Sequence, residues 1–273
     1  MPLYVVATPI GNLGDLTERA REVLAGCDGV VAEDTRHSGN LLKHLGIRKP
    51  LYALPAFDEA ARVEPLVRRL AAGESLALVT DAGTPAVSDP GGVLVRRAVE
   101  EGVRVVPVPG ASAAVAAVSV SGFPEARFHF AGFLPRKASH RMAMLEELRE
   151  LRAQLVFYES PQRLSRTLAD LRSSLGDRPA LVARELTKLH EELARGTLSA
   201  LESHFSGEVR GEVAIVVRGA EEPPPDDPDA LQAEIEQRLA RGERPKEIAE
   251  ALSPPHSRRE VYQLALELKK RGS

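Results

Sequence analysis

Residues 1–17, MPLYVVATPIGNLGDLT, are the stretch that decides the fold of this chain. Residues 3–7 form a short apolar run with β-branched side chains, which is typical of a buried strand. A loop rich in proline and glycine follows at residues 8–15, and an amphipathic helical pattern begins near Thr17. Open α/β sheets bind small ligands where a strand runs through such a loop into a helix, because backbone N–H groups are exposed there. The stretch therefore predicts the first strand and helix of a parallel sheet, joined by either a ligand site or only a tight turn.

Two more loops of the same kind favour the ligand site. The apolar strand pattern at residues 75–80 ends in the loop DAGTPAVSDPGG at residues 81–92. A third pattern, at residues 103–109, opens into GASAA at residues 110–114, whose small side chains let a ligand or a helix approach the backbone closely. Loops at the carboxyl ends of parallel strands gather along one edge of the sheet. We therefore expect the three loops to form one crevice.

The glycine spacing argues against the two most common nucleotide sites. The first loop does not match G-x-G-x-x-G, and G-x-x-x-x-G-K-[ST] does not occur in the sequence. Dinucleotide-binding and NTPase folds hold phosphates on those motifs. The crevice should therefore bind a ligand of another class.

Six motifs follow one another along the chain: ATPIGNLGDLT (7–17), AEDTR (32–36), TDAGTPAVSDPG (80–91), VPGASA (108–113), GFLPRK (132–137) and FYESPQR (157–163). In order and spacing they resemble the tetrapyrrole-methylase superfamily, from residue 3 to about residue 218 and more loosely beyond. The resemblance implies a two-lobed α/β fold, that of the class III methyltransferases, with S-adenosylmethionine as cofactor. Within the superfamily, the second and third motifs resemble the branch that methylates the 2′-hydroxyl of a cytidine in the RNA of the small ribosomal subunit.

The resemblance also implies which residues hold the cofactor. By motif position they are Pro9, Asp81, Ala82, Gly83, Thr84, Val87, Ser112, Ala113 and Leu186. Thr84 departs from the wider superfamily, in which an acidic residue at this position contacts the cofactor ribose, and Asp81 is the nearest carboxylate. We expect no metal ion, because the seven histidines show no ligand spacing and Cys27 is the only cysteine.

Methyl transfer to a ribose hydroxyl needs the two reacting atoms held in line and a base that removes the hydroxyl proton. Asp34 follows a predicted buried strand at the ligand edge and is the predicted base. Glu159, from the facing lobe, is the rival. Glu33 and Asp34 have an alternative role, because either can cap the helix that begins at Thr35.

The charge distribution bears on RNA binding. The net charge of −3 argues against a protein that coats nucleic acid indiscriminately, but it leaves room for a local basic face. The densest cluster of cations in the second lobe stands at a predicted helix start, where the helix dipole disfavours positive charge, and this favours a role in phosphate binding. The predicted RNA-binding residues are Arg136, Lys137, Arg141, Arg163, Arg184 and Lys188.

The length of 273 residues suits two domains better than one. We expect an α/β cofactor lobe at 1–116, an α/β substrate lobe at 117–220, an acidic proline-rich linker at 221–228 and a tail of helices at 229–273 that resembles a helix-turn-helix unit. Residues 118–124 are the expected crossing between the lobes. The chain has no apolar run that could span a bilayer and no signal-peptide pattern, which predicts a cytoplasmic protein.

The resemblance implies a homodimer that acts on small-subunit ribosomal RNA or on the 30S particle. Two other functions stay open at this point. One is a methyltransferase of the same superfamily with a small-molecule acceptor such as a tetrapyrrole. The other is a non-catalytic RNA-binding module in which the tail helices do the binding.

Overall fold

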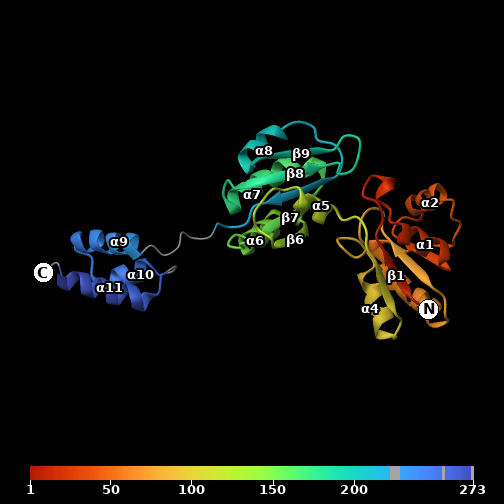
Figure 1. The fold of residues 1–273 in the computed structure, drawn as a ribbon, viewed down its shortest axis with the longest axis horizontal. Helices are drawn as coiled ribbons and strands as arrows, with labels where there is room; N and C mark the ends of the chain where they lie inside the picture. Colours follow the sequence, from red (N-terminus) through yellow and green to blue (C-terminus); the bar gives the residue numbers. More distant parts are fainter. Residues whose placement is uncertain (222–227, 254–255, 272–273) are drawn as a thin grey trace. The chain divides into compact units, whose positions relative to one another are not determined.

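The structure is a computed structural model that describes residues 1–221, 228–253 and 256–271 (Figure 1). The chain divides into two compact units, Met1–Ala220 and Glu221–Ser273. Most of the predicted linker, residues 222–227, lies outside the described residues. In the described part, no helix combines the length and the apolar character that crossing a membrane requires.

The first sheet of the larger unit has five parallel strands in the order β3-β2-β4-β1-β5. They are β1 (Leu3–Val6), β2 (Gly29–Ala32), β3 (Leu51–Ala53), β4 (Leu76–Val79) and β5 (Val105–Val108). The helices α1 (Glu18–Gly26) and α2 (Thr35–His44) contribute to the apolar core on one face, while α3 (Glu59–Ala71) and α4 (Gly92–Glu100) contribute to a second core on the other. The inner strands β2 and β4 are therefore buried along their whole length, as expected for a parallel sheet covered on both faces.

Strand order explains why the three predicted loops meet. Strand β1 lies between β4 and β5, so the loops after these three strands leave neighbouring strands at the same edge of the sheet. This edge is the topological switch point, since the chain turns to one side of β1 for β4 and to the other for β5. The expectation of one crevice at this edge agrees with the strand order.

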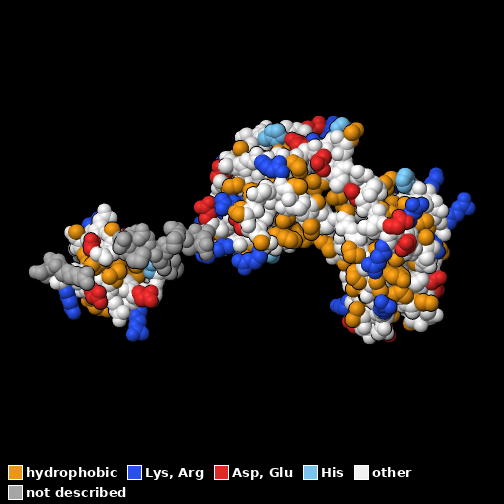
Figure 2. All heavy atoms as spheres, in the orientation of Figure 1, with side chains coloured by type: hydrophobic (Ala, Val, Ile, Leu, Met, Phe, Trp, Pro, Cys, Tyr) orange, Lys and Arg blue, Asp and Glu red, His pale blue; other side chains and the backbone are white. Residues whose placement is uncertain are grey.

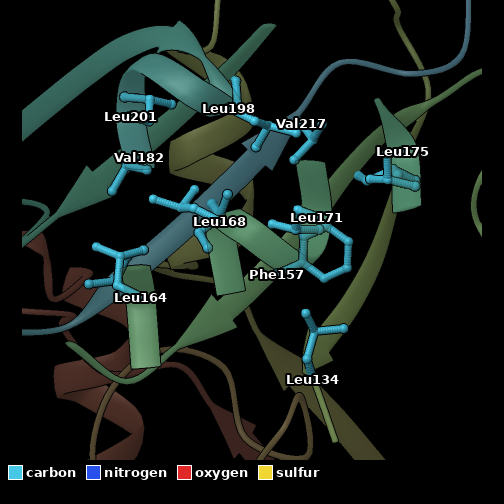
Figure 3. Packing of buried hydrophobic residues seen from close by; sticks show 14 of the residues in the cluster. Leu134, Phe157, Leu164, Leu168, Leu171, Leu175, Val182, Leu198, Leu201 and Val217 are labelled. Atoms are coloured by element: carbon cyan, nitrogen blue, oxygen red, sulfur yellow. The ribbon is translucent and has the colours of Figure 1, made fainter. Parts of the chain in front are cut away.

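The second sheet is mixed, with the order β6-β7-β10-β8-β9. Strands β6 and β7 are parallel, and the remaining pairs are antiparallel. The strands are β6 (Phe128–Phe133), β7 (Gln154–Glu159), β8 (Pro179–Arg184), β9 (Glu192–Thr197) and β10 (Val213–Val217). Residues from α6 (Ala138–Glu147), α7 (Leu164–Leu175) and α8 (Leu198–His204) complete the core on one face, where Phe157 points in among leucines (Figure 3).

Helix α5 (Ala113–Ser119) covers the opposite face of this second sheet, with Ala114 and Ala117 packed against Val156, Leu181 and Val216. The chain therefore passes from the first sheet to the second at residues 109–112, before the expected crossing at 118–124. The physical reason is that the alanine face of α5 lets the helix lie close on the second sheet. Strands β3 and β9 were not expected from the sequence: β3 has three residues, and β9 is an edge strand with charged residues.

The smaller unit consists of α9 (Pro228–Ala240), α10 (Pro245–Ala251) and α11 (Arg258–Arg271). Its helices share an apolar core of their own that includes Ile235, Ile248, Val261 and Leu268. The segment predicted as a tail of helices at 229–273 is thus helical over most of its described length, and α9 begins one residue before it.

Candidate active site

A cavity of about 470 Å³ opens at the carboxyl edge of the first sheet, facing the second sheet. The loops after β1, β4 and β5 contribute Ile10, Gly83 and Ser112 among others, and β7, β8 and the start of β10 supply much of the opposite wall. The complete lining is Ile10, Glu33, Asp81, Ala82, Gly83, Thr84, Val87, Ser88, Asp89, Ser112, Ala113, Phe133, Tyr158, Glu159, Ser160, Pro161, Ala183, Leu186, Gly211, Glu212, Val213 and Ala214.

Hydrogen bonds join the three loops into one frame. The backbone N–H of Thr8 donates to the carbonyl of Gly83 (2.8 Å), and the N–H of Gly83 donates back to Thr8 (3.1 Å). The Thr84 hydroxyl donates to the carbonyl of Ala111 in the third loop (3.2 Å). Gly83 has φ +87°, a conformation that side chains with a Cβ rarely adopt. The first-lobe wall of the cavity is therefore built largely from backbone, and its shape depends on glycine at 83.

The two lobes also touch beside the cavity. Ala86 and Ser88 have positive φ angles of 65° each, so the second loop takes a conformation that is uncommon for residues other than glycine. The Ser88 hydroxyl lies 2.9 Å from the point where a Cβ on Gly132 would stand. Glycine at 132, itself at φ +66°, thus allows this loop to lie directly against strand β6.

Three carboxylates give the cavity its electrostatic character. Burial raises the pKa of Glu33, and the negative charges of Asp89 and Asp81 raise it further. Burial also raises the pKa of Asp89, again with a contribution from Asp81. One oxygen of Asp81, Oδ1, is buried and has no hydrogen-bond partner among the described residues. An unsatisfied buried carboxylate oxygen, on a residue whose charge acts on two further carboxylates, favours a ligand that brings positive charge or hydroxyl donors.

S-adenosylmethionine fits this cavity chemically. Its sulfonium and ammonium groups are cationic and its ribose carries hydroxyl donors, which match the carboxylates, while Ile10, Val87 and Leu186 supply apolar surface. A metal ion has less support, because within the described residues no group of three or more His, Cys, Asp or Glu side chains is arranged to hold one.

Eight of the nine predicted cofactor residues line the cavity: Asp81, Ala82, Gly83, Thr84, Val87, Ser112, Ala113 and Leu186. Pro9 does not, and its neighbour Ile10 takes that place. The hydroxyl of Thr84 is already bonded to Ala111, which leaves Asp81 as the better partner for a ribose hydroxyl.

The two predicted bases are both engaged elsewhere. Asp34 caps α2 by accepting from the N–H of Arg36 (2.8 Å) and pairs with its guanidinium (2.7 Å). The Arg36 side chain holds the pKa of Asp34 far below its usual range, and Asp34 is not part of the cavity lining. Asp34 is therefore a helix cap, the alternative that the sequence left open, and not a base in the cavity.

Glu159 lines the cavity, but its side chain is fully buried and its oxygens are occupied. It accepts from the N–H of Ser160 (2.7 Å) and the hydroxyl of Thr167 (2.7 Å), and it pairs with Arg163 (3.2 Å). It can position the start of α7 but has little capacity left for a substrate proton.

Glu33 is a carboxylate of the cavity that the sequence analysis did not predict as the base. It precedes Asp34 in the short link between β2 and α2, and it lines the cavity whereas Asp34 does not.

Arg141 is not available to RNA. Its side chain is 3% exposed, pairs with Asp170 (2.7 Å) and donates to the carbonyls of Pro135 and Arg136 (3.0 Å each). Arg141 therefore holds the loop before α6 in place. In the sequence alone, an arginine with this structural role looks the same as one that binds phosphate.

Three more of the predicted RNA-binding cations form ion pairs: Arg163 with Glu159, Arg184 with Glu192 (2.8 Å), and Lys188 with both Glu185 and Glu212 (2.8 Å each). Arg136 and Lys137 are exposed and form no side-chain ion pair within the described residues. The loop between β6 and α6 thus carries two exposed cations, three and four residues after Phe133 of the cavity lining. On the face that Figure 2 shows, Lys and Arg side chains stand singly or in small groups, and hydrophobic patches lie among them.

Comparison with known proteins agrees with this picture. A model of the tetrapyrrole (corrin/porphyrin) methylase family matches residues 2–202. The chain is 50% identical over 222 residues to the ribosomal RNA small subunit methyltransferase I of Xylella fastidiosa, covering 80% of this chain and 81% of that one. The protein of the same name from Synechocystis is 43% identical over 99% of both chains, so that match includes the tail. The solved structure of diphthine synthase superposes with a TM-score of 0.63 at 17% identity, over 80% of this chain and 90% of that one.

The two α/β sheets, the cavity at the switch point and the family match define a methyltransferase of the tetrapyrrole-methylase fold. The chain belongs to the tetrapyrrole methylase family and, within it, to the family of the ribosomal RNA small subunit methyltransferases I.

Proposed function

We propose that this chain transfers a methyl group from S-adenosylmethionine to the 2′-hydroxyl of a cytidine in the RNA of the small ribosomal subunit. The observation that carries the proposal is the acidic cavity, which is framed by backbone on one side and by second-lobe side chains on the other, among them Phe133 shortly before the exposed cations Arg136 and Lys137. The identity of 43–50% to relatives named as small-subunit RNA methyltransferases supports ribosomal RNA as the substrate. A tetrapyrrole acceptor has weaker support, because the structures with such titles are only 18–22% identical.

The cofactor supplies a methyl group already activated by its sulfonium charge, so the chain has to position the acceptor oxygen in line with it. In this proposal the frame of the three loops holds the methyl donor in place. Positioning of the two reacting atoms alone can supply several kcal/mol of the activation barrier. Asp81 is the residue that we assign to a hydroxyl or the ammonium group of the cofactor, because its buried oxygen Oδ1 lacks any other partner in the described chain.

Glu33 is the base in this proposal. It lines the cavity, and burial with two neighbouring carboxylates raises its pKa, which makes it a better proton acceptor than an ordinary glutamate. As the bond from the 2′-oxygen to the methyl carbon forms and the bond from sulfur to that carbon breaks, the hydroxyl proton passes to the Glu33 carboxylate.

Arg136 and Lys137 are the residues that we assign to RNA phosphates, with the helical tail as a second contact. The enzyme acts in the cytoplasm as a homodimer in this proposal. Large hydrophobic side chains that stay exposed in the larger unit, such as Phe57, Val99 and Val115, supply apolar surface for such a contact. Light scattering at micromolar concentration tests the dimer, and a monomer mass would contradict it.

The activity is tested with small subunits from a strain that lacks the gene, incubated with the purified protein and labelled S-adenosylmethionine. We expect label in the RNA at a cytidine ribose, detected by mapping 2′-O-methylation, and no label with Asp81→Asn. Label in a co-purified small molecule instead, or no label in RNA, would overturn the proposal.

A further inference from the structure

Phe133 is an exposed aromatic side chain of the cavity lining that the proposed methyl transfer does not use. It is 55% exposed and lines the cavity, whereas Phe157 on the neighbouring strand is completely buried in the core (Figure 3). A single exposed apolar residue needs no explanation by itself. Three further observations show that this one is held in a fixed position facing the cavity.

A β-bulge turns Phe133 toward the cavity. Side chains alternate between the faces of a strand, so Phe130 and Phe133 should lie on opposite faces. The register of β6 shifts between Phe130 and Gly132, however, and Phe133 pairs with Tyr158 while Phe130 pairs with Val156. Val156 and Tyr158 are two residues apart and share a face, so the bulge brings Phe133 onto the same face as Phe130. Bulges that redirect a side chain are common next to active sites.

Tyr158 holds the ring of Phe133 from behind. The two rings meet edge to face with centroids 5.7 Å apart, and Tyr158 meets Phe130 in the same way at 4.9 Å. The hydroxyl of Tyr158 accepts from the N–H of Ala114 (3.1 Å), which fixes the ring that supports Phe133. Only part of the Phe133 ring is covered, and the rest is open to a planar group.

The position of Phe133 suits a contact with the acceptor nucleotide better than a contact with the cofactor. The inner lining around Ile10 and Gly83 is buried, whereas Phe133 lies at the exposed mouth, three and four residues before the free cations Arg136 and Lys137. An aromatic platform followed by cations on one loop suits an unstacked nucleotide, whose base stacks while its flanking phosphates bind the cations.

We propose that Phe133 is the stacking platform for the base of the nucleotide whose ribose is methylated. This inference rests on the proposed function and adds that the nucleotide is turned out of the RNA fold, with its base on the Phe133 ring and its ribose at Glu33. Phe133 is thus a positioning residue of the acceptor side.

The test compares Phe133→Ala, Phe133→Leu and Phe133→Tyr with Phe128→Ala. Phe128 lies at the other end of the same strand, is 43% exposed and is not part of the cavity lining, so its variant loses a similar side chain without touching the site. We expect Phe133→Ala to raise the KM for small subunits about ten- to hundredfold, the range for losing one base–aromatic stack. Phe133→Tyr and Phe128→Ala should have the KM of the wild type, and Phe133→Leu should have a KM between those of the wild type and Phe133→Ala.

Calorimetry with S-adenosylmethionine separates this role from a cofactor role, and we expect the Kd to be the same in all four variants. A fluorescent cytidine analogue at the methylated position should be quenched by the wild type and by Phe128→Ala but not by Phe133→Ala. An unchanged KM for Phe133→Ala, or a loss of cofactor affinity that matches the rise in KM, would overturn the inference while wild-type activity upholds the proposed function. A wild type that methylates no small-subunit RNA would overturn both.

Discussion

The two walls of the cavity are built in different ways. The first-lobe wall consists of loops after three neighbouring parallel strands, tied together through backbone groups at Thr8, Gly83 and Ala111. The second-lobe wall consists of side chains such as Phe133, Tyr158 and Glu159 on a mixed sheet with a bulge. A wall built from backbone loses its shape when a substitution changes the backbone conformation. A wall built from side chains can lose one contact while the other contacts remain. Substitutions on the first-lobe wall should therefore cost more than substitutions on the second-lobe wall.

Gly83→Val should abolish binding of S-adenosylmethionine. A β-branched residue at φ +87° is strained, and its Cβ would already be in van der Waals contact with Ile10 (3.5 Å), so its γ-methyl groups would add bulk inside the cavity lining. Gly73→Val is the matched control, because Gly73 has φ +91° in a turn after α3 with open space around it. We expect calorimetry to show no binding for the first variant and normal binding for the second, with similar losses in Tm. Equal cofactor affinity in both variants would contradict a backbone-built site.

Glu33→Gln should lower kcat about 10²–10⁴-fold with little change in cofactor Kd, because it removes the base but keeps the shape. Asp34→Asn is the control and should leave kcat unchanged, since asparagine caps a helix as well as aspartate does. A normal kcat in Glu33→Gln would show that positioning alone carries the reaction.

The pH dependence of kcat offers an independent check of Glu33. The base acts when deprotonated and its pKa is raised in the folded protein, so the rate should rise with pH through a midpoint above that of ordinary glutamate. This rise should disappear in Glu33→Gln. Asp89 also has a raised pKa, so a rise that persists in Glu33→Gln and disappears in Asp89→Asn would assign the base to Asp89.

The contrast between the walls also explains what the sequence could predict. Motif order placed the loops at Gly83 and Ser112 correctly, because strand order alone brings the carboxyl ends of neighbouring parallel strands together. Arg141 was misjudged as an RNA contact because burial of a charge depends on a distant partner, Asp170. Phe133 was not singled out because its direction depends on a bulge, although the glycine before it is the kind of signal that marks one.

Lys137→Ala and Arg141→Ala should separate RNA binding from loop stability. Lys137 is exposed, so its variant should raise the KM for small subunits a few-fold and lower the salt dependence of binding by about one counterion. Arg141 is buried against Asp170, and its loss should lower the free energy of unfolding by about 3 kcal/mol. Denaturant unfolding and binding titrations at several salt concentrations measure the two effects. A salt dependence that changes equally in both variants would contradict the separate roles.

Deletion of residues 221–273 should have the smallest effect on the cofactor site and a graded effect on RNA. The helices of this unit pack on a core of their own, and every residue that lines the cavity belongs to Met1–Ala220. Cofactor Kd should therefore stay within about twofold of the full chain, since nothing in the loop frame depends on the tail. Affinity for small subunits should fall and become less dependent on salt, because the described part of α11 carries cations such as Arg259 and Lys270 that can release counterions from RNA. Charge-neutral substitution of these two residues in the full chain is the control that separates lost charge from lost structure. If the truncated enzyme binds and methylates small subunits as the full chain does, the tail is not needed for RNA binding. The second-lobe wall then selects the RNA, and Phe133, Arg136 and Lys137 contribute more to RNA binding than proposed.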